Sequence, residues 1–279
     1  EHLDFYGSFE KLKRSFRNFI EKTPSFGKSL ICIDNKNLKS LISACKTSNY
    51  LTYGFDKNSN YQIVNAKKKI DHSIFDLKVK FSEKKIYKIK NIRVNLIGDH
   101  NIVNATASIA IALNLGIKIE KIKRALKKFM GIQRRFTKIF SVQGREFYDD
   151  YAHHPTEIKA VLNGARSVYE KRKIICVFQP HRYSRVKSLK KEFASSFVES
   201  DGVILCPVYS AGEKKRYNFN QKNFSKIISK KSKIQVINIQ NQKELKNYFI
   251  KNLSNDELVI CMGAGSISNW IREIGKELK

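Results

Sequence analysis

The sequence predicts an α/β protein that contains a parallel sheet, and two observations support this prediction. Residues 173–178 read Lys-Ile-Ile-Cys-Val-Phe, an apolar, β-branched run typical of a strand buried on both faces. Residues 156–171 precede that run and place Ile158, Val161 and Leu162 at helical spacing. Strand and helix then alternate regularly toward the end of the chain.

The other elements are predicted from similar patterns. Arg145–Asp150 is predicted to be a strand that ends in two acidic residues, and Pro155 suits the first position of the following helix. The later segments are predicted as strands at 203–206, 234–239 and Leu258–Met262, and as helices at 224–229, 243–253 and Ile267–Leu278. The segments before residue 131 are predicted as strands at 29–33 and 92–97, and as helices at 9–20, 101–115 and 119–129.

Two candidate breaks divide the chain, a polar stretch at 84–90 and a junction at 131–135. Only the second separates different patterns, because the regular alternation starts there. The predicted domains are therefore residues 1–130 and 131–279. A chain of 279 residues with 42% hydrophobic residues is long enough to supply two cores.

The formal net charge of +29 raises the question of a nucleic-acid partner. A nucleic-acid binder concentrates basic residues on one face and interleaves them with aromatic residues. Here the lysines are spread from Lys11 to Lys279 in a chain rich in Ile and Asn, a composition that AT-rich codons produce without any partner. We therefore predict no specific nucleic-acid partner, although the positive charge would help to attract anionic substrates.

Cysteine usage and hydropathy indicate the compartment. The five cysteines are odd in number, lack Cys-x-x-Cys spacing and mostly lie in apolar runs, so we expect buried, reduced thiols. No apolar stretch approaches the roughly 20 residues of a membrane span. We expect a cytoplasmic protein without a membrane partner.

Polar side chains are concentrated directly after two of the predicted strands. Residues 149–157 read Asp-Asp-Tyr-Ala-His-His-Pro-Thr-Glu, and residues 179–185 read Gln-Pro-His-Arg-Tyr-Ser-Arg. The right-handed crossover of a strand-helix-strand unit places both strand ends on the same edge of the sheet. Ligands bind at that edge in open α/β sheets, so we expect the two clusters to form one pocket.

The residue types in these clusters suit an anionic or amine-bearing ligand. Arg182 and Arg185, at the start of a predicted helix, can offer guanidinium groups to a carboxylate or phosphate, assisted by the helix dipole. Asp149 and Asp150 can accept hydrogen bonds from ribose hydroxyls, an amine or a metal-bound water. The alternative is that the arginines are solvated surface charges, which we consider the weaker interpretation for two such clusters at adjoining strand ends.

Histidines fall almost entirely inside the unusual motifs. His153 and His154 titrate near neutrality, so either could orient or deprotonate an attacking amine, unless they only cap a helix. Five of the six histidines lie within motifs and only His72 lies outside; the five are His2, His100, His153, His154 and His181.

Several motifs together resemble the Mur ligase family. The two clusters resemble its C-terminal domain, and the other matches keep the family order over nearly the whole chain. They are the opening Glu-His-Leu-Asp-Phe-Tyr, the Gly-x-His-Asn-x-x-Asn pattern at 98–104, the Arg-Arg-Phe at 134–136 and the Gly-Ala-Gly at 263–265. The last motif is weaker evidence, because a strand-to-helix turn often needs glycine for its backbone alone, and Ser266 stands where the family more often has Asp or Asn.

The resemblance implies a fold and an activity. It implies the C-terminal part of a P-loop-type ATPase central domain, followed by a Rossmann-like α/β domain. It also implies an ADP-forming amide ligase of peptidoglycan precursor synthesis, in which ATP phosphorylates the carboxylate of UDP-N-acetylmuramate and the amine of L-alanine attacks the acyl phosphate. Two alternatives stay open: a ligase that adds a preformed tripeptide to the same UDP-sugar, and a noncatalytic module that binds nucleotide, nucleic acid or a protein partner.

The resemblance also implies roles for individual residues. The nucleotide site would comprise His100, Asn101 and Asn104, with Arg135 at the phosphates and Asp150 at the ribose. The amino-acid site would comprise Tyr151, His153, Arg182 and Arg185, with His153 also serving as a base.

The family's phosphate loop and UDP-sugar-binding domain are not found in this sequence. Gly27-Lys28-Ser29 cannot replace the phosphate loop, because Lys22 stands where the loop needs glycine. His2 would bind Mg²⁺ and would need a carboxylate partner at or just upstream of Glu1. We therefore expect a C-terminal fragment that is inactive without the N-terminal portion of the same protein.

Overall fold

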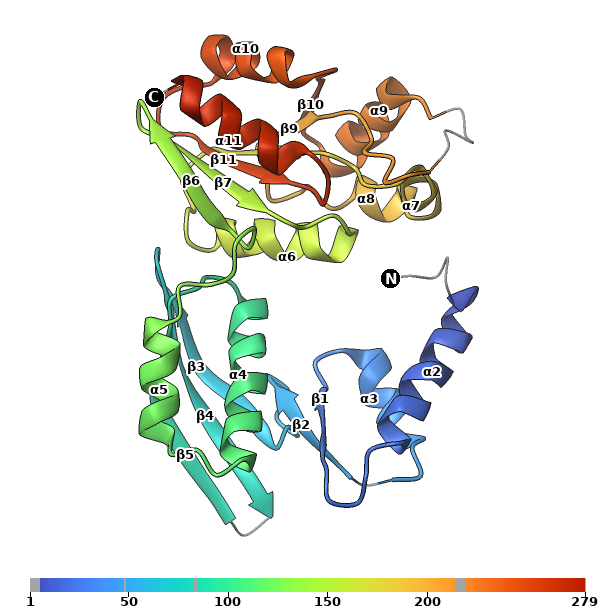
Figure 1. Ribbon diagram of the computed structural model, residues 1–279, viewed down its shortest axis with the longest axis vertical. Coiled ribbons are helices and arrows are strands. Elements are labelled where there is room, and N and C mark those ends of the chain that lie inside the picture. Colours follow the sequence, from blue (N-terminus) through green and yellow to red (C-terminus); the bar gives the residue numbers. More distant parts are fainter. Residues whose placement is uncertain (1–5, 48, 83–84, 214–218, 279) are drawn as a thin grey trace. The chain divides into compact units, whose positions relative to one another are not determined.

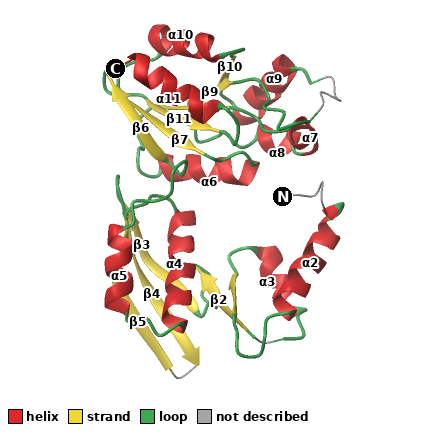
Figure 2. Cartoon of the chain, viewed as in Figure 1, coloured by secondary structure: helices red, strands yellow, loops and turns green. Residues whose placement is uncertain are grey.

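The computed structural model describes residues 6–47, 49–82, 85–213 and 219–278. The chain divides into two compact units, Glu1–Met130 and Gly131–Lys279, which are described separately (Figure 1). Each unit contains one β-sheet with helices packed on it (Figure 2). The predicted α/β class is confirmed.

The second unit is built on a six-stranded sheet with the strand order β10-β9-β8-β11-β7-β6. Its strands are β6 (Thr137–Val142), β7 (Arg145–Asp150), β8 (Ile174–Phe178), β9 (Gly202–Leu205), β10 (Gln235–Asn238) and β11 (Leu258–Met262). All neighbours run parallel except β6, which pairs antiparallel with β7. Strands β8 and β11 are buried at every position, as expected for a sheet covered on both faces.

Helices cover both faces of this sheet. They are α6 (Pro155–Arg166), α7 (Tyr183–Ser188), α8 (Lys190–Ala194), α9 (Gln221–Ser232), α10 (Gln242–Asn252) and α11 (Ile267–Leu278). Apolar residues of α6, α8 and α9 pack on one face, and those of α10 and α11 pack on the other. The loops after β7, β8, β9 and β11 therefore emerge together at the carboxyl edge of the sheet.

The first unit has a five-stranded sheet with the order β1-β2-β3-β4-β5. Its strands are β1 (Ser29–Cys32), β2 (Tyr50–Gly54), β3 (Tyr61–Lys68), β4 (Ser73–Ser82) and β5 (Lys85–Val94), the first three parallel and the last two antiparallel to their neighbours. The helices are α2 (Phe9–Glu21), α3 (Lys36–Ser43), α4 (Asp99–Asn114) and α5 (Ile119–Lys128). One core joins α4 and α5 to β3, β4 and β5, and a smaller one joins α2 and α3 to β1.

Several predicted boundaries were wrong. Residues 85–90 of the polar stretch lie in β5 and are exposed except for Ile89, so this candidate break falls inside a strand. The strand predicted at 92–97 ends at Val94. Beyond it, the carbonyl oxygens of Leu96 and Ile97 accept hydrogen bonds from the side chains of Ser73 and Asn101. The helix predicted at 156–171 ends at Arg166, whose Nη1 donates to the carbonyls of three of the next six residues and folds the chain back.

The expectation of buried, reduced thiols holds in part. All five cysteines are unpaired, but only Cys176, Cys206 and Cys261 are buried, while Cys32 and Cys45 are partly exposed. Burial raises the pKa of all five thiols. Within the described part of the chain, no helix combines the length and the apolar character needed to cross a membrane.

Candidate active site

The two polar clusters meet at the carboxyl edge of the second unit's sheet. Strand β11 lies between β7 and β8, so the two strands that carry the clusters are not neighbours. The loops that follow these strands nevertheless converge, as the distance of 5.7 Å between the ring centroids of His153 and His181 shows. The juxtaposition expected from the crossover rule is therefore present in the structure.

Four rings form a continuous aromatic row along this edge, consisting of Tyr151, His153, His181 and Tyr209. Successive centroids are 5.2, 5.7 and 5.6 Å apart, and the His181 and Tyr209 rings are stacked with an interplanar angle of 19°. Tyr151 and Tyr209 are 36% and 42% exposed, so the two ends of the row face solvent. The row therefore lines this edge of the sheet with partly exposed rings.

The two arginines lie at the start of α7, as expected. Arg182 occupies the N-cap position of this helix and Arg185 lies in its first turn, but α7 has only six residues, so the guanidinium groups supply most of the positive charge. Nη1 of Arg185 lies 3.2 Å from Nδ1 and 3.4 Å from the carbonyl oxygen of His181. Burial of His181, together with the charges of Arg185, His153 and Arg182, lowers the pKa of its imidazole to about 4. His181 is therefore neutral near pH 7 and can accept a hydrogen bond from Arg185.

The adjacent histidines have different tasks. His154 caps α6: its Nδ1 accepts from the backbone nitrogen of Thr156 at 3.4 Å, and Glu157 completes a capping box. The helix-cap interpretation therefore holds for His154. His153 instead contributes its ring to the aromatic row, with Nδ1 2.9 Å from the carbonyl oxygen of Tyr151. Because that carbonyl only accepts, Nδ1 carries the proton in neutral His153 and Nε2 is left as the basic nitrogen.

Asp150 is buried beneath these loops and is 2% exposed. Its Oδ2 accepts from the backbone nitrogen of Phe136 at 2.8 Å, and its Oδ1 accepts from that of Ala152 at 2.7 Å. Burial raises the pKa of this carboxyl to about 6, against the lowering effect of these hydrogen bonds and of Arg135. The carboxylate thus joins the segment that carries Arg135 to the loop after β7.

Asp149 is also fully buried and points toward α11. Its Oδ2 accepts from the hydroxyl of Ser268 at 2.5 Å and from Nη2 of Arg272 at 3.3 Å. Nε of Arg134 lies 3.8 Å from the same oxygen. This carboxylate anchors the end of β7 to the last helix of the unit and is not presented to solvent.

The Arg-Arg-Phe segment lies beside Tyr151. The guanidinium of Arg134 stands 4.7 Å from the centre of the Tyr151 ring, and its Nη2 donates to the carbonyl oxygen of Gly263 at 2.6 Å. The backbone nitrogen of Tyr151 donates to the carbonyl oxygen of Arg134 at 2.8 Å. Arg135 is exposed, with its guanidinium 5.9 Å from the same ring. Arg134 therefore holds the tyrosine, and Arg135 is free to face a ligand.

The Gly-Ala-Gly turn has a structural reason for both glycines. Gly263 has φ +153°, and a Cβ there would lie 2.8 Å from the carbonyl oxygen of Gln179. A Cβ at Gly265 would lie 2.5 Å from both Oε1 of Gln179 and Cγ of Tyr209. Oε1 of Gln179 accepts from the backbone nitrogen of Ile267 at 3.0 Å. The turn lets Gln179 and Tyr209 approach closely, which explains its composition without any ligand.

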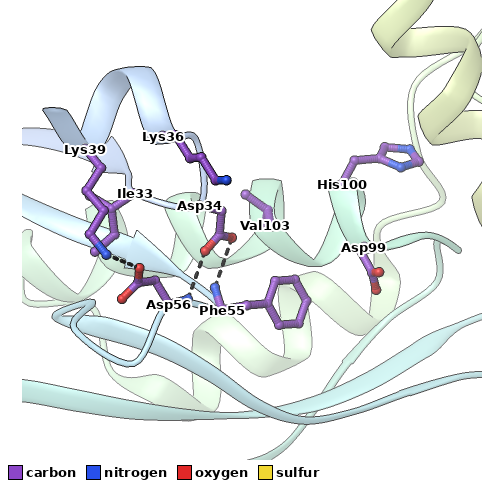
Figure 3. Close-up of a pocket in the computed structure, with 9 residues that line it drawn as sticks. All are labelled: Ile33, Asp34, Lys36, Lys39, Phe55, Asp56, Asp99, His100 and Val103. Atoms are coloured by element: carbon purple, nitrogen blue, oxygen red, sulfur yellow. Dashed lines mark hydrogen bonds and ion pairs between the residues drawn. The ribbon is translucent and has the colours of Figure 1, made fainter. Parts of the chain in front are cut away.

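The first unit has a cavity of about 670 Å³ at the carboxyl ends of β1 and β2 (Figure 3). Its floor is fixed by Asp34, whose two carboxylate oxygens accept from the backbone nitrogens of Phe55 and Asp56 at 3.0 and 2.9 Å. The lining residues are Ile33, Asp34, Lys36, Lys39, Phe55, Asp56, Asp99, His100 and Val103.

Only one of the three residues expected at the nucleotide lines this cavity. His100, at the start of α4, does so. Nδ2 of Asn101 donates to the carbonyl oxygen of Ile97 at 2.7 Å, so this side chain holds the loop before α4. Asn104 is exposed one turn along the same helix.

The proposed metal ligand cannot be placed. His2 lies outside the described residues. Among the residues that are described, no three His, Cys, Asp or Glu side chains are grouped so that they could hold a metal ion.

Comparison with known protein families decides the affiliation of the chain. The model of the Mur ligase middle domain matches residues 1–112, and the model described as "Mur ligase, glutamate ligase domain" matches residues 134–265. The chain belongs to the Mur ligase family. The resemblance inferred from the motifs is thereby confirmed.

Individual relatives share this affiliation. The chain is 50% identical over 274 residues to UDP-N-acetylmuramate--L-alanine ligase of Pelagibacter ubique, and 37% identical over 279 residues to the enzyme of that name from Sinorhizobium medicae. These matches cover 98% and 100% of this chain but only 59% of each relative, so the chain spans about three fifths of their length.

Solved structures of Mur ligases have the same fold. A UDP-N-acetylmuramate-alanine ligase from Thermotoga maritima has a TM-score of 0.74 at 24% identity over 99% of this chain and 57% of that one. A MurF ligase from the same organism, described as in complex with ADP, has a TM-score of 0.72 at 14% identity over 99% of this chain and 59% of that one.

Three residues of this Mur ligase's candidate site carried no assigned role in the sequence analysis. His181 stood inside a recognised motif, but its neutral state depends on Arg185 and on burial. The sequence analysis assigned a role to Arg135 and none to Arg134, because a pair of adjacent arginines does not show which side chain packs inward. Tyr209 lies in an irregular loop, and no periodicity in the sequence there marks it as a site residue.

Proposed function

We propose that these 279 residues supply the amino-acid-binding part and some of the nucleotide-binding part of an ADP-forming ligase that joins L-alanine to UDP-N-acetylmuramate. The observation that carries this proposal is the pair of guanidinium groups, Arg182 and Arg185, beside an aromatic row at a sheet edge. A Mur ligase needs to hold one small carboxylate there, and the relatives of highest listed identity are named for this reaction.

The arrangement assigns a task to each group in the amino-acid site. Arg182 and Arg185 would hold the carboxylate of L-alanine, with the neutral His181 keeping Arg185 in place. Nε2 of His153 would accept the proton that the alanine ammonium must lose before its nitrogen can attack. The nitrogen would then attack the carbonyl carbon of the acyl phosphate, a C–N bond would form, and inorganic phosphate would leave.

ATP is the second substrate of this proposal, and the residues present fit only part of it. Arg135 is exposed and could face the phosphates, and His100 lies at a cavity with Lys36 and Lys39. Mg²⁺, for which His2 and a carboxylate would be ligands, would neutralise phosphoryl charge. A ribose contact for Asp150 stays a prediction, since both of its carboxylate oxygens already hold backbone nitrogens.

The test uses a chimeric ligase in which residues 1–279 replace the matched segment of the Pelagibacter relative. The parent chimera should form ADP and phosphate only with UDP-N-acetylmuramate and L-alanine present. Arg182→Ala should raise the KM for L-alanine by on the order of tenfold to a hundredfold, the loss expected for charge-assisted hydrogen bonds, and leave the KM for ATP within about twofold.

Arg124→Ala is the matched control, because it removes an exposed arginine from α5 of the other unit. An unchanged KM for L-alanine in Arg182→Ala would remove this residue from the site. A parent chimera that used a preformed tripeptide in place of L-alanine would establish the rival ligase activity.

A further inference from the structure

The loop after β9 is hydrogen-bonded to the loop that carries Arg182 and Arg185. Residues 206–213, here called the strap, run beside residues 178–185, here called the arginine loop. The strap donates from the backbone nitrogens of Cys206 and Tyr209 to the carbonyls of Phe178 and Pro180, at 2.9 and 2.8 Å, and Tyr209 accepts from the backbone nitrogen of Arg182 at 2.8 Å. The strap is therefore bonded to the arginine loop along its length.

The strap maintains an unfavourable backbone conformation at Arg182. This residue has φ +69°, in the left-handed region that side chains other than those of Gly, Asn and Asp seldom occupy. Such a conformation is strained and persists only where the surroundings enforce it. The hydrogen bond to Tyr209 and the stacking of Tyr209 on His181 enforce it here.

The strap ends in a carboxylate that holds the residue between the two arginines. Oε2 of Glu213 accepts from the backbone nitrogen of Ser184 at 3.2 Å, and Oε1 accepts from the hydroxyl of the same serine. A turn with the backbone nitrogen of Glu213 bonded to the carbonyl of Ser210 presents this side chain. Although partial burial raises the pKa of Glu213, the hydrogen bonds from Ser184 and Tyr183 and the charge of Arg182 bring it below its ordinary value. Glu213 is therefore ionised at neutral pH.

We propose that Glu213 is a positioning residue for the arginine pair of the amino-acid site. By fixing both the backbone and the hydroxyl of Ser184, it sets the directions in which Arg182 and Arg185 leave the chain, so that both guanidinium groups can serve one carboxylate. This inference rests on the proposed function. It assigns a task in substrate recognition to a residue that touches no substrate and lies 28 residues beyond the motif that carries the arginines.

The experiment measures the KM for L-alanine, the KM for ATP and kcat in the chimeric ligase. Glu213→Ala should raise the KM for L-alanine on the order of tenfold and leave kcat and the KM for ATP within about threefold. Glu213→Gln keeps one acceptor oxygen, so its KM should lie between those of the parent and Glu213→Ala. Ser184→Ala, which loses only the hydroxyl, should raise the KM for L-alanine about threefold by itself, and it should add little to Glu213→Ala in the double variant.

Glu244→Ala is the matched control, because Glu244 also accepts a backbone hydrogen bond at a helix start of the same unit, from Gln240 at 2.8 Å. It should change none of the three constants. If Glu213→Ala does not fold, the KM values of Ser184→Ala test the positioning role instead. A KM for L-alanine within twofold of the parent in the tested variant, or an equal rise in the KM for ATP, would overturn the positioning role. A parent chimera that does not ligate L-alanine would refute the proposed function and this inference with it. If the parent is active but Glu213→Ala leaves its KM for L-alanine unchanged, only this inference is refuted.

Discussion

Replacing Asp150 by Asn should remove a pH-dependent part of the free energy of unfolding of the second unit. Burial raises the pKa of this carboxyl from its ordinary value of 3.8 to about 6. The folded chain therefore holds the proton more tightly than the unfolded chain does. As the pH rises through the window from about 4 to about 6, the unfolded chain loses this proton first, so the free energy of unfolding falls.

The size of the effect follows from the shift. A difference of about two pKa units corresponds to about 3 kcal/mol, which is present in full below pH 4 and lost above pH 6. Asn cannot ionise, so its contribution is constant, although it forfeits one backbone hydrogen bond because its amide nitrogen cannot accept from Phe136. As the pH falls from 7 to 4, the parent should therefore gain about 3 kcal/mol relative to Asp150→Asn.

Urea unfolding at several pH values measures this difference. The single tryptophan, Trp270, lies in α11 against the sheet core, so its fluorescence reports the second unit. Comparing two variants at each pH cancels the contributions of all other titrating groups. Asp256→Asn, at a side chain that is 82% exposed, controls for the removal of a surface carboxylate. A difference between the parent and Asp150→Asn that stays constant from pH 7 to 4 would refute the reasoning.

Two further predictions concern the packing around the arginine loop. Gly265→Ala places a Cβ within 2.5 Å of Tyr209 and Gln179, so it should lower the free energy of unfolding by about 1–3 kcal/mol in the same urea assay. Gly202→Ala is the control: its Cβ would have its nearest contact at 3.4 Å and should lower the free energy of unfolding by less. Equal losses in the two variants would contradict the predicted clash at Gly265. His181 should stay neutral down to about pH 5, so the chemical shift of its Cε1 proton should be flat from pH 8 to 5 in an NMR titration, and a midpoint near 6.5 would show that Arg185 and burial do not depress its pKa.

The parallel sheet of the second unit could be predicted because its central strands β8 and β11 are buried on both faces. Such strands form continuous apolar runs, so Leu258–Met262 was identified at both ends, and Ile267–Leu278 followed from its own helical periodicity. The meeting of the two clusters was predicted by the handedness of one crossover. The position of β11 between β7 and β8 was not predictable in this way, because it depends on a pairing more than eighty residues distant in sequence.

The elements that were missed carry less information in their sequence. Strand β4 alternates apolar and polar residues, and the exposed lysines of β5 produced the polar stretch that was considered as a candidate break. The strap has no periodicity at all, since its contribution is made by backbone hydrogen bonds and one carboxylate. Backbone hydrogen bonding between distant loops leaves no local pattern, which is why Tyr209 and Glu213 emerged only from the structure.

The acidic pair at the end of β7 shows how the fold divides one motif into two tasks. Successive residues of a strand point to opposite faces, so Asp149 is directed to Ser268 and Arg272 of α11, and Asp150 to the backbone of Phe136 and Ala152. Neither carboxylate is presented to solvent, although the sequence analysis treated both as possible hydrogen-bond acceptors for a ligand and placed Asp150 at the ribose. Their burial fixes the two loops that carry Arg135, Tyr151 and His153. A site for a small ligand needs such support, because few contacts are available and each loses strength when its side chain is free to move.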